Sequence, residues 1–482
     1  MHKKVPRLVK VFFRQKHPKR GNMNLNTILN QFRKFLPPEW LNSFARQSGL
    51  IKRSSARLIG QDYCQLLIQA VNSSSELSLS EFCKHLYEIN SSVKLKPQSL
   101  WEYIVKRESV VFMEGIYAKT WAIYVEQIKR HCSTDSHGFL NQFTQVFIED
   151  STIIQLNEKL SSMFKGCGGS ASRAAIKIHL AFDVLSSKFS FLKIHQGKVT
   201  DVSLAFEAVR NLTEGSLLMR DLGFFVIDAF RKICEKNAYF ISRLHPGVNV
   251  YLKADDSNPI DLVRYLNCNY KLFASGSMIV FMGIQEKLPV RLIFYRAPEE
   301  IVNTRKRKVK RNREKHGHTA SEHLLAWQEF TFLITNLSEE IAPTKIIGTI
   351  YRLRWQVELI FKNWKSHLSL DVLRGSRPER IEVFLYAKLI GILMLGLVCN
   401  YLKTMTLKLF GTVEISEMKV AKFIVSTEFF NGLFKGYLKK TLIHFTNDVY
   451  WIKQFCKQKR KRKTTIERID SQEQFGTHQA LA

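Results

Sequence analysis

The sequence lacks several patterns that mark common protein classes. Its eight cysteines are widely spaced and include no CxxC pair, which argues against zinc ribbons and disulfide frameworks and fits a reducing cytosol. The histidines show no HxxxH or HExxH spacing, so zinc chemistry has little support. There is no internal repeat, and the basic N-terminal stretch lacks the apolar core of a secretory signal.

Acidic residues are scarce. The chain has 42 Asp and Glu residues against 73 Lys and Arg residues, which gives a formal net charge of +31. That excess is larger than solubility requires and indicates a polyanionic partner. Nucleic acid is the first candidate, an anionic membrane surface is the second, and an RNA-rich assembly is the third.

Long uncharged hydrophobic runs are missing too. The most apolar stretch, Ile381 to Leu402, contains Glu382 and Lys388 and has Asn400 near its end. A membrane-spanning helix needs about 20 largely uncharged residues. We therefore interpret this stretch as a buried core helix and expect no membrane partner. The hydrophobic fraction of 45% is sufficient for a sizeable core.

The length of 482 residues predicts two or three domains rather than one. Helical patterns come first, a β-rich pattern follows, and a second β-rich segment interrupts it before the last helices. We expect these divisions: 1–23 as a basic leader, with Met23 as an alternative start; 24–125 as an α-helical domain; 126–245 and 343–405 as two parts of an α/β domain; 246–342 as a β-rich insertion; and 406–482 as a C-terminal helical region with a basic tail.

The first helices carry start and stop signals. Pro37 and Pro38 precede an amphipathic run that Gly49 ends. Residues 78–107 predict two helices around a short polar turn, followed by basic residues, which is compatible with a helix-turn-helix reader of DNA. The alternative is a small helical bundle without DNA contact. The overall positive charge favours a DNA-binding domain.

From residue 144 the hydrophobic period changes from helical to β. Three strands are predicted in succession, and a helix, a strand, a helix and a strand follow up to residue 245. This order describes a mixed sheet covered by helices. Within the insertion, strands at 289–297 and 329–337 are separated by the basic run 304–318. A long helix is then predicted from about Thr344 to His367.

That long helix presents a distinctive polar face. At about 100° per residue, Tyr351, Arg354, Glu358 and Lys365 share an arc of about 60°. A solvated face with Arg–Glu support four residues apart is the ordinary interpretation of such charges. The spacing Tyr-x2-Arg-x3-Glu-x6-Lys is more specific, because a chance match in this chain is on the order of one in a hundred or less.

This spacing resembles the YREK signature of DDE-type insertion-sequence transposases, and the resemblance covers roughly residues 25–400. It implies an RNase H-like catalytic domain with an α/β fold, interrupted here by the insertion 246–342. It also implies three acids: Asp150 on the first strand, Asp221 at the end of the fourth strand, and Glu358 in the signature. The separations are 221 − 150 = 71 and 358 − 221 = 137 residues, and the longer one resembles members that carry such an insertion.

The chemistry of phosphodiester attack explains the three carboxylates. Two Mg²⁺ ions about 3.5–4 Å apart can serve both the attacking and the leaving oxygen, and Mg²⁺ prefers hard oxygen ligands. Mn²⁺ is an expected substitute. Without cations the acids would raise one another's pKa. Arg354 and Lys365 are placed to offset this repulsion and to bind phosphates, and the resemblance suggests that Tyr351 bonds a terminal phosphate.

Other acids compete for these roles. Strand alternation sends Glu149 to the face opposite Asp150, so we favour Asp150 as the metal ligand. Asp183 at the end of the second strand and Asp228 in a helix are more often structural. Asp201 is expected to cap a helix.

Three further elements are candidates for DNA contact. The run 305–315 has eight cations in eleven positions and can follow a phosphate backbone. Its leading cations are Arg305, Lys306, Arg307 and Lys308. Trp327 can stack on a base displaced during cleavage, although a core position at a strand edge is at least as good an interpretation. The segment 457–463 is most simply a solvated tail.

The resemblance implies metal-dependent cleavage at transposon ends and attack of the freed 3′-hydroxyl on target DNA, in cut-and-paste transposition. A homodimer is expected because two terminal inverted repeats must be brought together, and the expected location is the bacterial cytoplasm, on the nucleoid. One alternative is an RNase H-like nuclease without strand transfer. Another is a catalytically inactive DNA-binding descendant, against which intact Asp150, Asp221 and Glu358 argue.

Overall fold

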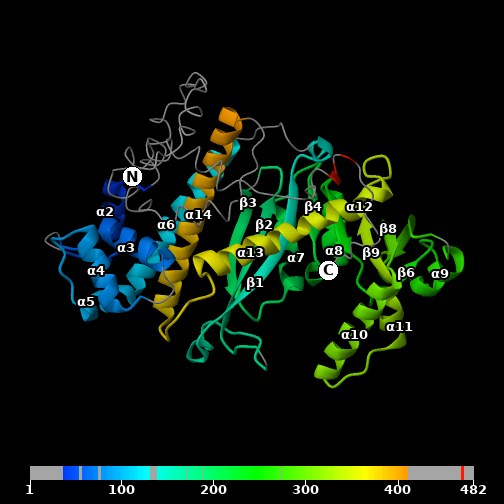
Figure 1. The fold of residues 1–482 in the computed structure, drawn as a ribbon, viewed down its shortest axis with the longest axis horizontal. Coiled ribbons are helices and arrows are strands. Elements are labelled where there is room, and N and C mark those ends of the chain that lie inside the picture. Colours follow the sequence, from blue (N-terminus) through cyan, green and yellow to red (C-terminus); the bar gives the residue numbers. More distant parts are fainter. Residues whose placement is uncertain are drawn as a thin grey trace, which may run out of the picture.

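The computed structural model of the chain describes residues 36–53, 57–73, 77–130, 138–169, 171–186, 188–271, 273–410, 468–469 and 471. The predicted leader 1–23, the tail segment 457–463 and most of the predicted region 406–482 lie outside these residues. Figure 1 shows the N-terminal helices at one end of the molecule, a sheet in the middle and the insertion at the other end.

The N-terminal part is helical. Its helices are α2 (Pro38–Gln47), α3 (Gly60–Ser73), α4 (Leu79–Ile89), α5 (Pro97–Ile104) and α6 (Arg107–Arg130). Pro37 and Pro38 begin α2, and Gly49 adopts a φ of 76° beyond its end, a conformation that favours glycine. Ser78 and Glu81 form a capping box at the start of α4. The start and stop signals of the sequence are therefore used in the structure.

The predicted succession of three strands, helix, strand, helix and strand is confirmed. The elements are β1 (Val146–Gln155), β2 (Ala175–Asp183), β3 (Lys188–Gln196), α7 (Asp201–Arg210), β4 (Leu217–Arg220), α8 (Ile227–Glu235) and β5 (Tyr239–Arg243). The strands lie in the order β3-β2-β1-β4-β5. β1, β4 and β5 are parallel, whereas β2 runs antiparallel to both β1 and β3.

The insertion extends the same sheet. Its strands are β6 (Val250–Tyr251), β7 (Ser275–Met282), β8 (Leu288–Arg296) and β9 (Phe330–Thr335), and its helices are α9 (Leu262–Asn269), α10 (Glu299–Lys315) and α11 (Glu322–Ala326). They continue the strand order as β5-β9-β8-β7-β6. The basic run between β8 and β9 forms helix α10, to which the sequence pattern assigned no secondary structure. Lys and Arg are good helix formers, and the acidic first turn and basic last turn of α10 complement its dipole.

The long helix predicted over 344–367 is interrupted in the structure. α12 (Thr344–Tyr351) is followed by the 3-10 turn η6 (Arg352–Arg354) and then by α13 (Trp355–Leu368). A helical wheel at about 100° per residue therefore does not hold across the signature. α13 crosses one face of the sheet, and α14 (Pro378–Phe410) lies between the sheet and the N-terminal helices (Figure 1). Among the described residues, the other 3-10 turns are η2 (Gly138–Gln142), η3 (Glu158–Leu160), η4 (Leu222–Phe224) and η5 (Trp327–Glu329).

Two buried clusters cover the two faces of the sheet. One joins the N-terminal helices, α13 and α14 to the face that carries Ile148 and Ile154. The other joins α7, α8 and the insertion to the face that carries Phe147. Successive residues of β1 therefore enter different cores. The predicted class, an RNase H-like α/β fold with a mixed sheet, is confirmed. No helix among the described residues is long and apolar enough to cross a membrane.

Candidate active site

Asp150 and Asp221 are brought together by the parallel pairing of β1 with β4. The register of these strands places Glu149 beside Arg220. Asp150 follows Glu149 in β1, and Asp221 follows Arg220, the last residue of β4. The two aspartates therefore lie side by side just beyond the paired residues. Residues at the same register of parallel strands point to the same face. Both carboxylates are therefore carried on the face that α13 crosses.

Glu358 joins the two aspartates from α13, which packs against β1. Arg354 lies between the acids: its Nη1 is 3.5 Å from Oδ2 of Asp150, and its Nη2 is 2.7 Å from Oε1 of Glu358. The Arg354 side chain is 9% exposed, whereas those of Asp150 and Glu358 are 20% and 34% exposed. One buried guanidinium thus bridges two carboxylates at the border between core and solvent.

The pKa of Asp150 reflects this crowding. Burial, with smaller contributions from the charges of Asp221 and Glu358, raises the pKa of Asp150 to about 7. The backbone N–H of Ser151 and the guanidinium of Arg354 act in the opposite direction. Carboxylates that repel one another in a partly buried site are relieved by an added cation. The three acids therefore have the electrostatics of a cation site.

Tyr351 is buried beside Arg354, whose guanidinium carbon lies 6.0 Å from the centroid of its ring. It is only 3% exposed, and its hydroxyl donates a hydrogen bond to the backbone oxygen of Arg220 at 3.1 Å. Burial raises the pKa of Tyr351 above its usual value. Because Arg220 immediately precedes Asp221, this hydrogen bond holds the end of β4 under α12. The suggested contact of Tyr351 with a terminal phosphate stays a prediction.

An open pocket of about 400 Å³ lies over two of the acids. It is lined by Asp150, Ser151, Thr152, Glu358, Phe361, Lys362, Lys365 and Ser366. Lys365 donates a hydrogen bond through Nζ to the backbone oxygen of Ile153 at 3.2 Å. Lys362 is exposed in the same opening but was not singled out from the sequence, although it follows Glu358 by four residues on one helix. Carboxylates that suit a cation and ammonium groups that suit phosphates share this opening.

The competing acids have other surroundings. Glu149 is fully buried on the opposite face of the sheet, where Nε of Arg220 donates to it at 2.9 Å. Asp183 accepts hydrogen bonds from the backbone N–H of Val146 in β1 and from backbone and hydroxyl groups of the turn after β2. Asp228 is an exposed residue of α8. Strand alternation therefore separates Glu149 from Asp150 as predicted.

Asp201 differs from its expected role as a helix cap. The N-cap of α7 is Thr200, whose hydroxyl accepts from the backbone N–H of Ser203. Asp201 occupies the first helical position, and its Oδ1 accepts hydrogen bonds from Lys177 Nζ and Ser151 Oγ, each at 2.7 Å. The expectation was wrong by one residue, because the threonine in front of Asp201 has the extended backbone that a cap requires.

The leading cations of α10 have two kinds of surroundings. Arg305 donates to backbone carbonyls and a threonine hydroxyl near the start of β9, and Lys306 Nζ lies 3.1 Å from Oε1 of Glu329. Arg307 and Lys308 are exposed. Arg305 and Lys306 thus hold α10 against the rest of the insertion, and Arg307 and Lys308 face solvent.

Trp327 packs in the insertion. It lies in η5, its ring centroid is 4.5 Å from that of Phe332, and it borders the buried cluster of the insertion. These contacts match the core interpretation, and base stacking by Trp327 stays a prediction.

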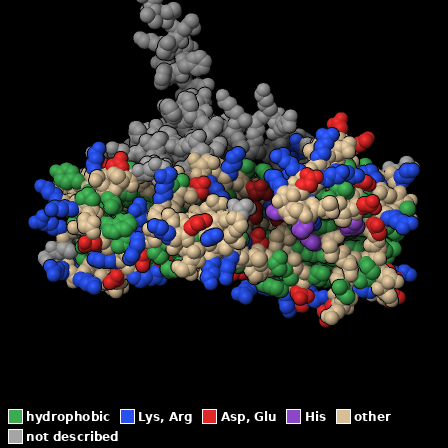
Figure 2. Space-filling view, turned by 90° about the horizontal axis from the view of Figure 1, so that it is seen from below, with side chains coloured by type: hydrophobic (Ala, Val, Ile, Leu, Met, Phe, Trp, Pro, Cys, Tyr) green, Lys and Arg blue, Asp and Glu red, His purple; other side chains and the backbone are tan. Residues whose placement is uncertain are grey.

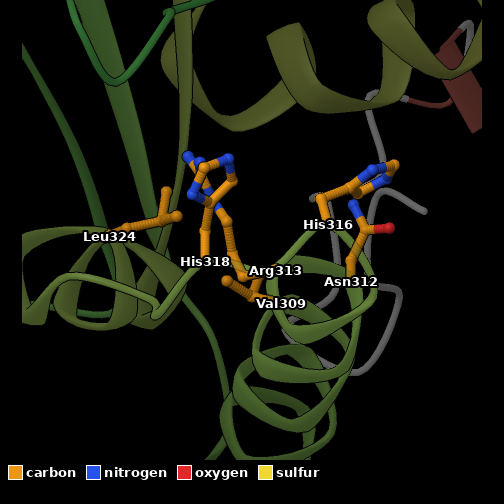
Figure 3. A pocket seen from close by; sticks show the side chains of 6 residues that line it. All are labelled: Val309, Asn312, Arg313, His316, His318 and Leu324. Carbon is orange, nitrogen blue, oxygen red and sulfur yellow. The ribbon is translucent and has the colours of Figure 1, made fainter.

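A second opening, of about 500 Å³, lies at the C-terminal end of α10. It is lined by Val309, Asn312, Arg313, His316, His318 and Leu324. Figure 3 shows Arg313 and His318 directed toward one side of this opening, with His316 and Asn312 on its other side. Figure 2 shows Lys and Arg side chains spread over one face of the molecule and acidic side chains gathered in a hollow between its two halves. Positive charge therefore surrounds an acidic hollow on that face.

One cluster was missed from the sequence. His179, His195 and Glu207 meet on the face of the sheet opposite Asp150. They come from β2, β3 and α7, so the pairing of the strands, and not any short spacing, brings them together. The available signal is the tripeptide Lys-Ile-His, which occurs at 177–179 and again at 193–195.

Comparison with known proteins places these acids in a family context. The family described as Transposase DDE domain matches residues 141–394, a range that contains all three acids. The transposase for insertion sequence element IS231F of Bacillus thuringiensis subsp. israelensis is 27% identical over 384 residues, which cover 77% of this chain and 79% of that protein. The corresponding protein of IS231B, from B. thuringiensis subsp. berliner, is 29% identical and covers 74% and 76%. The transposase for IS1151 of Clostridium perfringens is 25% identical and covers 84% and 89%.

Proposed function

The chain belongs to the transposase DDE domain family, and on this premise we propose that it cuts DNA at transposon ends and joins the freed 3′-hydroxyl to target DNA. The observation that carries the proposal is the convergence of Asp150, Asp221 and Glu358 around the buried Arg354, at the edge of an open pocket. Three acids so placed suit phosphodiester chemistry, in which an attacking and a leaving oxygen must both be stabilised.

The donor set fits divalent magnesium. The three side chains offer carboxylate oxygens, which Mg²⁺ prefers, and the residues that line the pocket include neither His nor Cys. Two bound Mg²⁺ ions, for which Mn²⁺ can substitute, would supply activation of the attacking oxygen and stabilisation of the leaving oxygen. The pKa of Asp150, raised by burial and to a smaller extent by the neighbouring acids, supports this assignment, because a bound cation would stabilise the ionised carboxylate.

The chain's own residues divide the remaining tasks. Asp150 and Asp221 present their carboxylates from a rigid sheet, and Glu358 presents a third from α13. Arg354 holds two of these acids in place through its ion pairs. Lys362 and Lys365 are positioned in the same opening to bind DNA phosphates.

DNA is the proposed partner, and we propose that it contacts two parts of the molecule, the pocket of the acids and helix α10. Transposon terminal inverted repeats and target DNA would meet the acids in the pocket, and the exposed cations of α10 would follow the phosphate backbone. Cut-and-paste transposition requires two ends to be held together, so we propose a homodimer as the active form. The activity would take place in the bacterial cytoplasm, on the nucleoid.

The proposal is tested with Asp150→Ala, Asp221→Ala and Glu358→Ala in the full chain. Each variant is expected to abolish Mg²⁺-dependent cleavage of a transposon end and to leave binding of that end largely intact. Asp228→Ala, at an exposed acid of α8, is the matched control and should cleave normally. Near wild-type nicking by any of the three variants would remove that residue from the metal site. Cleavage without joined products would instead indicate a nuclease, and a complete lack of nicking by the wild type would indicate an inactive DNA-binding descendant.

A further inference from the structure

Three potential metal ligands meet behind the sheet, away from the three acids of the active site. His179 of β2, His195 of β3 and Glu207 of α7 each offer one ligand atom, and these atoms lie within 4.8 Å of one another. Nδ1 of His179 is 3.1 Å from Oε2 of Glu207, and Nε2 of His195 is 3.4 Å from the same oxygen. Two imidazole nitrogens and one carboxylate thus face a common point.

The protons of His179 do not satisfy both of its neighbours. Arg220 donates to one oxygen of the buried Glu149 at 2.9 Å, and Nε2 of His179 lies 2.9 Å from the other oxygen. The Nε2–H tautomer of His179 therefore donates to Glu149. A neutral imidazole has no second proton, so its Nδ1 lone pair faces the carboxylate of Glu207. This arrangement needs either a second proton on His179 or a cation between the two groups.

His195 points to a cation. Its Nε2 is buried and makes no hydrogen bond with any of the described residues, so this nitrogen is available to bind an ion. The separations of 3.1 and 3.4 Å from Glu207 Oε2 are close to the roughly 3.3 Å between ligand atoms of a tetrahedral site whose bonds are about 2.0–2.1 Å long. A proton on His179 would satisfy one nitrogen only.

We propose that His179 Nδ1, His195 Nε2 and a carboxylate oxygen of Glu207 bind a zinc-class divalent transition metal ion. Glu149 orients His179 through Nε2–H, in the manner of a carboxylate behind a metal-bound histidine. Two nitrogens and one oxygen select zinc-class ions, whereas the oxygen-only site of the three acids selects Mg²⁺. The ion joins β2, β3 and α7, so its role is structural and does not depend on the proposed reaction.

The surroundings leave room for this ion. The side chains of His195 and Glu207 are 20% and 18% exposed, so the cluster lies close to the protein surface. Lys193 is the competing cation: its Nζ is 3.4 Å from Oε1 of Glu207, the oxygen not shared with the histidines, and its side chain is 44% exposed.

The test is a direct metal titration of the full chain, purified without a histidine tag and stripped with a chelator. Zn²⁺ binding is measured by calorimetry in excess Mg²⁺, and Co²⁺ binding is followed by the visible absorption of four-coordinate Co²⁺. We expect one equivalent of each ion at this cluster. His195→Ala and Glu207→Gln should weaken binding by at least about tenfold. His85→Ala is the matched control, because His85 forms an exposed pair with Glu88 at 3.2 Å and belongs to no group of three potential metal ligands among the described residues.

The outcomes separate this site from the active site. Asp150→Ala should retain the full equivalent of Zn²⁺, since that variant removes only a ligand of the oxygen site. Loss of Zn²⁺ binding in Asp150→Ala, or unchanged binding in both His195→Ala and Glu207→Gln, would overturn the proposal. A wild type that binds no Zn²⁺ and carries a doubly protonated His179, seen by nitrogen-15 NMR of the imidazole, would also overturn it.

Discussion

Glu149 and Asp150 are adjacent carboxylates with opposite surroundings. Glu149 enters the core behind the sheet, where Arg220 and His179 compensate its charge. Asp150 faces the pocket with Arg354 as its partner. The two-residue period of a strand is enough to distinguish these acids from the sequence. The buried partners of Glu149 come from other strands, so only the sheet register reveals them.

The first residue-level prediction concerns pH. Asp150 is largely protonated below its pKa of about 7, and a bound metal ion must displace that proton. The apparent affinity for Mg²⁺ or Mn²⁺ should therefore fall by up to about tenfold per pH unit below pH 7 and level off above it. Because the folded pKa is raised from 3.8, Asp150 stabilises the metal-free fold at low pH, and this contribution is lost as pH rises toward and through 7.

Calorimetric titrations with Mn²⁺ at pH 6, 7 and 8 measure this dependence. Asp150→Asn, which has no carboxylate to titrate, should bind more weakly at pH 8 and show a flatter profile. A wild-type affinity that is the same at all three pH values would contradict the assignment of Asp150.

A second residue-level prediction separates Arg354 from Lys365. Removing Arg354 takes away the charge that lowers the pKa of Asp150, so the acid limb of the cleavage–pH profile should move to higher pH. Lys365 donates to the backbone of Ile153 and has no ion pair with Asp150, so Lys365→Ala should reduce cleavage without moving that limb. A charge-assisted contact contributes roughly 1.5–3 kcal/mol, so each loss corresponds to about ten- to a hundredfold in rate.

Single-turnover cleavage of a pre-bound transposon end between pH 6 and 9 distinguishes the two variants. Lys345→Ala, a residue of α12 outside the pocket, serves as the control for loss of a lysine. If both Arg354→Ala and Lys365→Ala cleave normally, the signature spacing has no catalytic meaning.

At the scale of elements, the strands were more predictable than the signature helix. Each strand of the first part is a short apolar run bounded by turn residues, and the strong burial of β1, β2 and β4 explains why the pattern is clear. No Pro or Gly marks the 3-10 turn at 352–354, so the sequence predicts one continuous helix there. Tyr351 is buried before this turn, with the guanidinium carbon of Arg354 6.0 Å from its ring centroid, and Arg354 at the end of the turn donates to Glu358.

A third prediction concerns helix α10. Its exposed cations should contribute to DNA binding, whereas Arg305, which is hydrogen-bonded to β9, should contribute mainly to stability. Changing Arg307, Lys308, Lys310 and Arg311 to Gln should weaken DNA binding at every sequence and reduce the log–log salt slope by about 0.9 for each DNA phosphate that is no longer neutralised. These residues are exposed, so thermal stability should change little. Binding measured between low and physiological salt gives the slope.

Arg305→Gln is the matched comparison on the same helix. Arg305 donates to the start of β9, so its loss should lower the free energy of unfolding by about 1.5–3 kcal/mol and change the salt slope less than the exposed set. An unchanged slope in the fourfold variant would show that the exposed face of α10 is only solvated.

Across the whole molecule, the N-terminal helices and the catalytic face share one hydrophobic core. α14 is the link, since it packs against both α3 and α6 and its cluster includes residues of β1 and α13. Lys388, within α14, donates through Nζ to the backbone oxygens of Val71 and Leu368, each at 3.1 Å. The apolar composition of α14 predicts a buried helix. Its contacts depend on the tertiary fold, because they join residues far apart in the sequence: Asn72 donates to the backbone oxygen of Ala387, 315 positions away.

Two glycines of α14 therefore test whether the N-terminal helices and the catalytic domain unfold together through this shared core. A Cβ at Gly391 would lie 2.5 Å from Nδ2 of Asn72, whose amide is already bound to the backbone oxygens of Ile68 and Ala387. A Cβ at Gly396 would meet Tyr124 at an ordinary 3.4 Å. Alanine is favoured over glycine in a helix by about 0.8–1 kcal/mol, so Gly396→Ala should stabilise the protein by about that amount. Gly391→Ala should destabilise it by about 1–3 kcal/mol, because overpacking at the close approach of α3 and α14 exceeds the gain in helix propensity.

Thermal unfolding followed by tryptophan fluorescence and by far-ultraviolet circular dichroism measures both effects. Since one core spans the helical and catalytic parts, the two probes should shift together in Gly391→Ala, and Mg²⁺-dependent cleavage should be lost at the same lower temperature. Separate transitions, with cleavage surviving after the N-terminal helices have unfolded, would show that the two parts are independent. Equal stabilisation by both alanines would show that α3 and α14 do not approach as closely as Asn72 and Gly391 indicate.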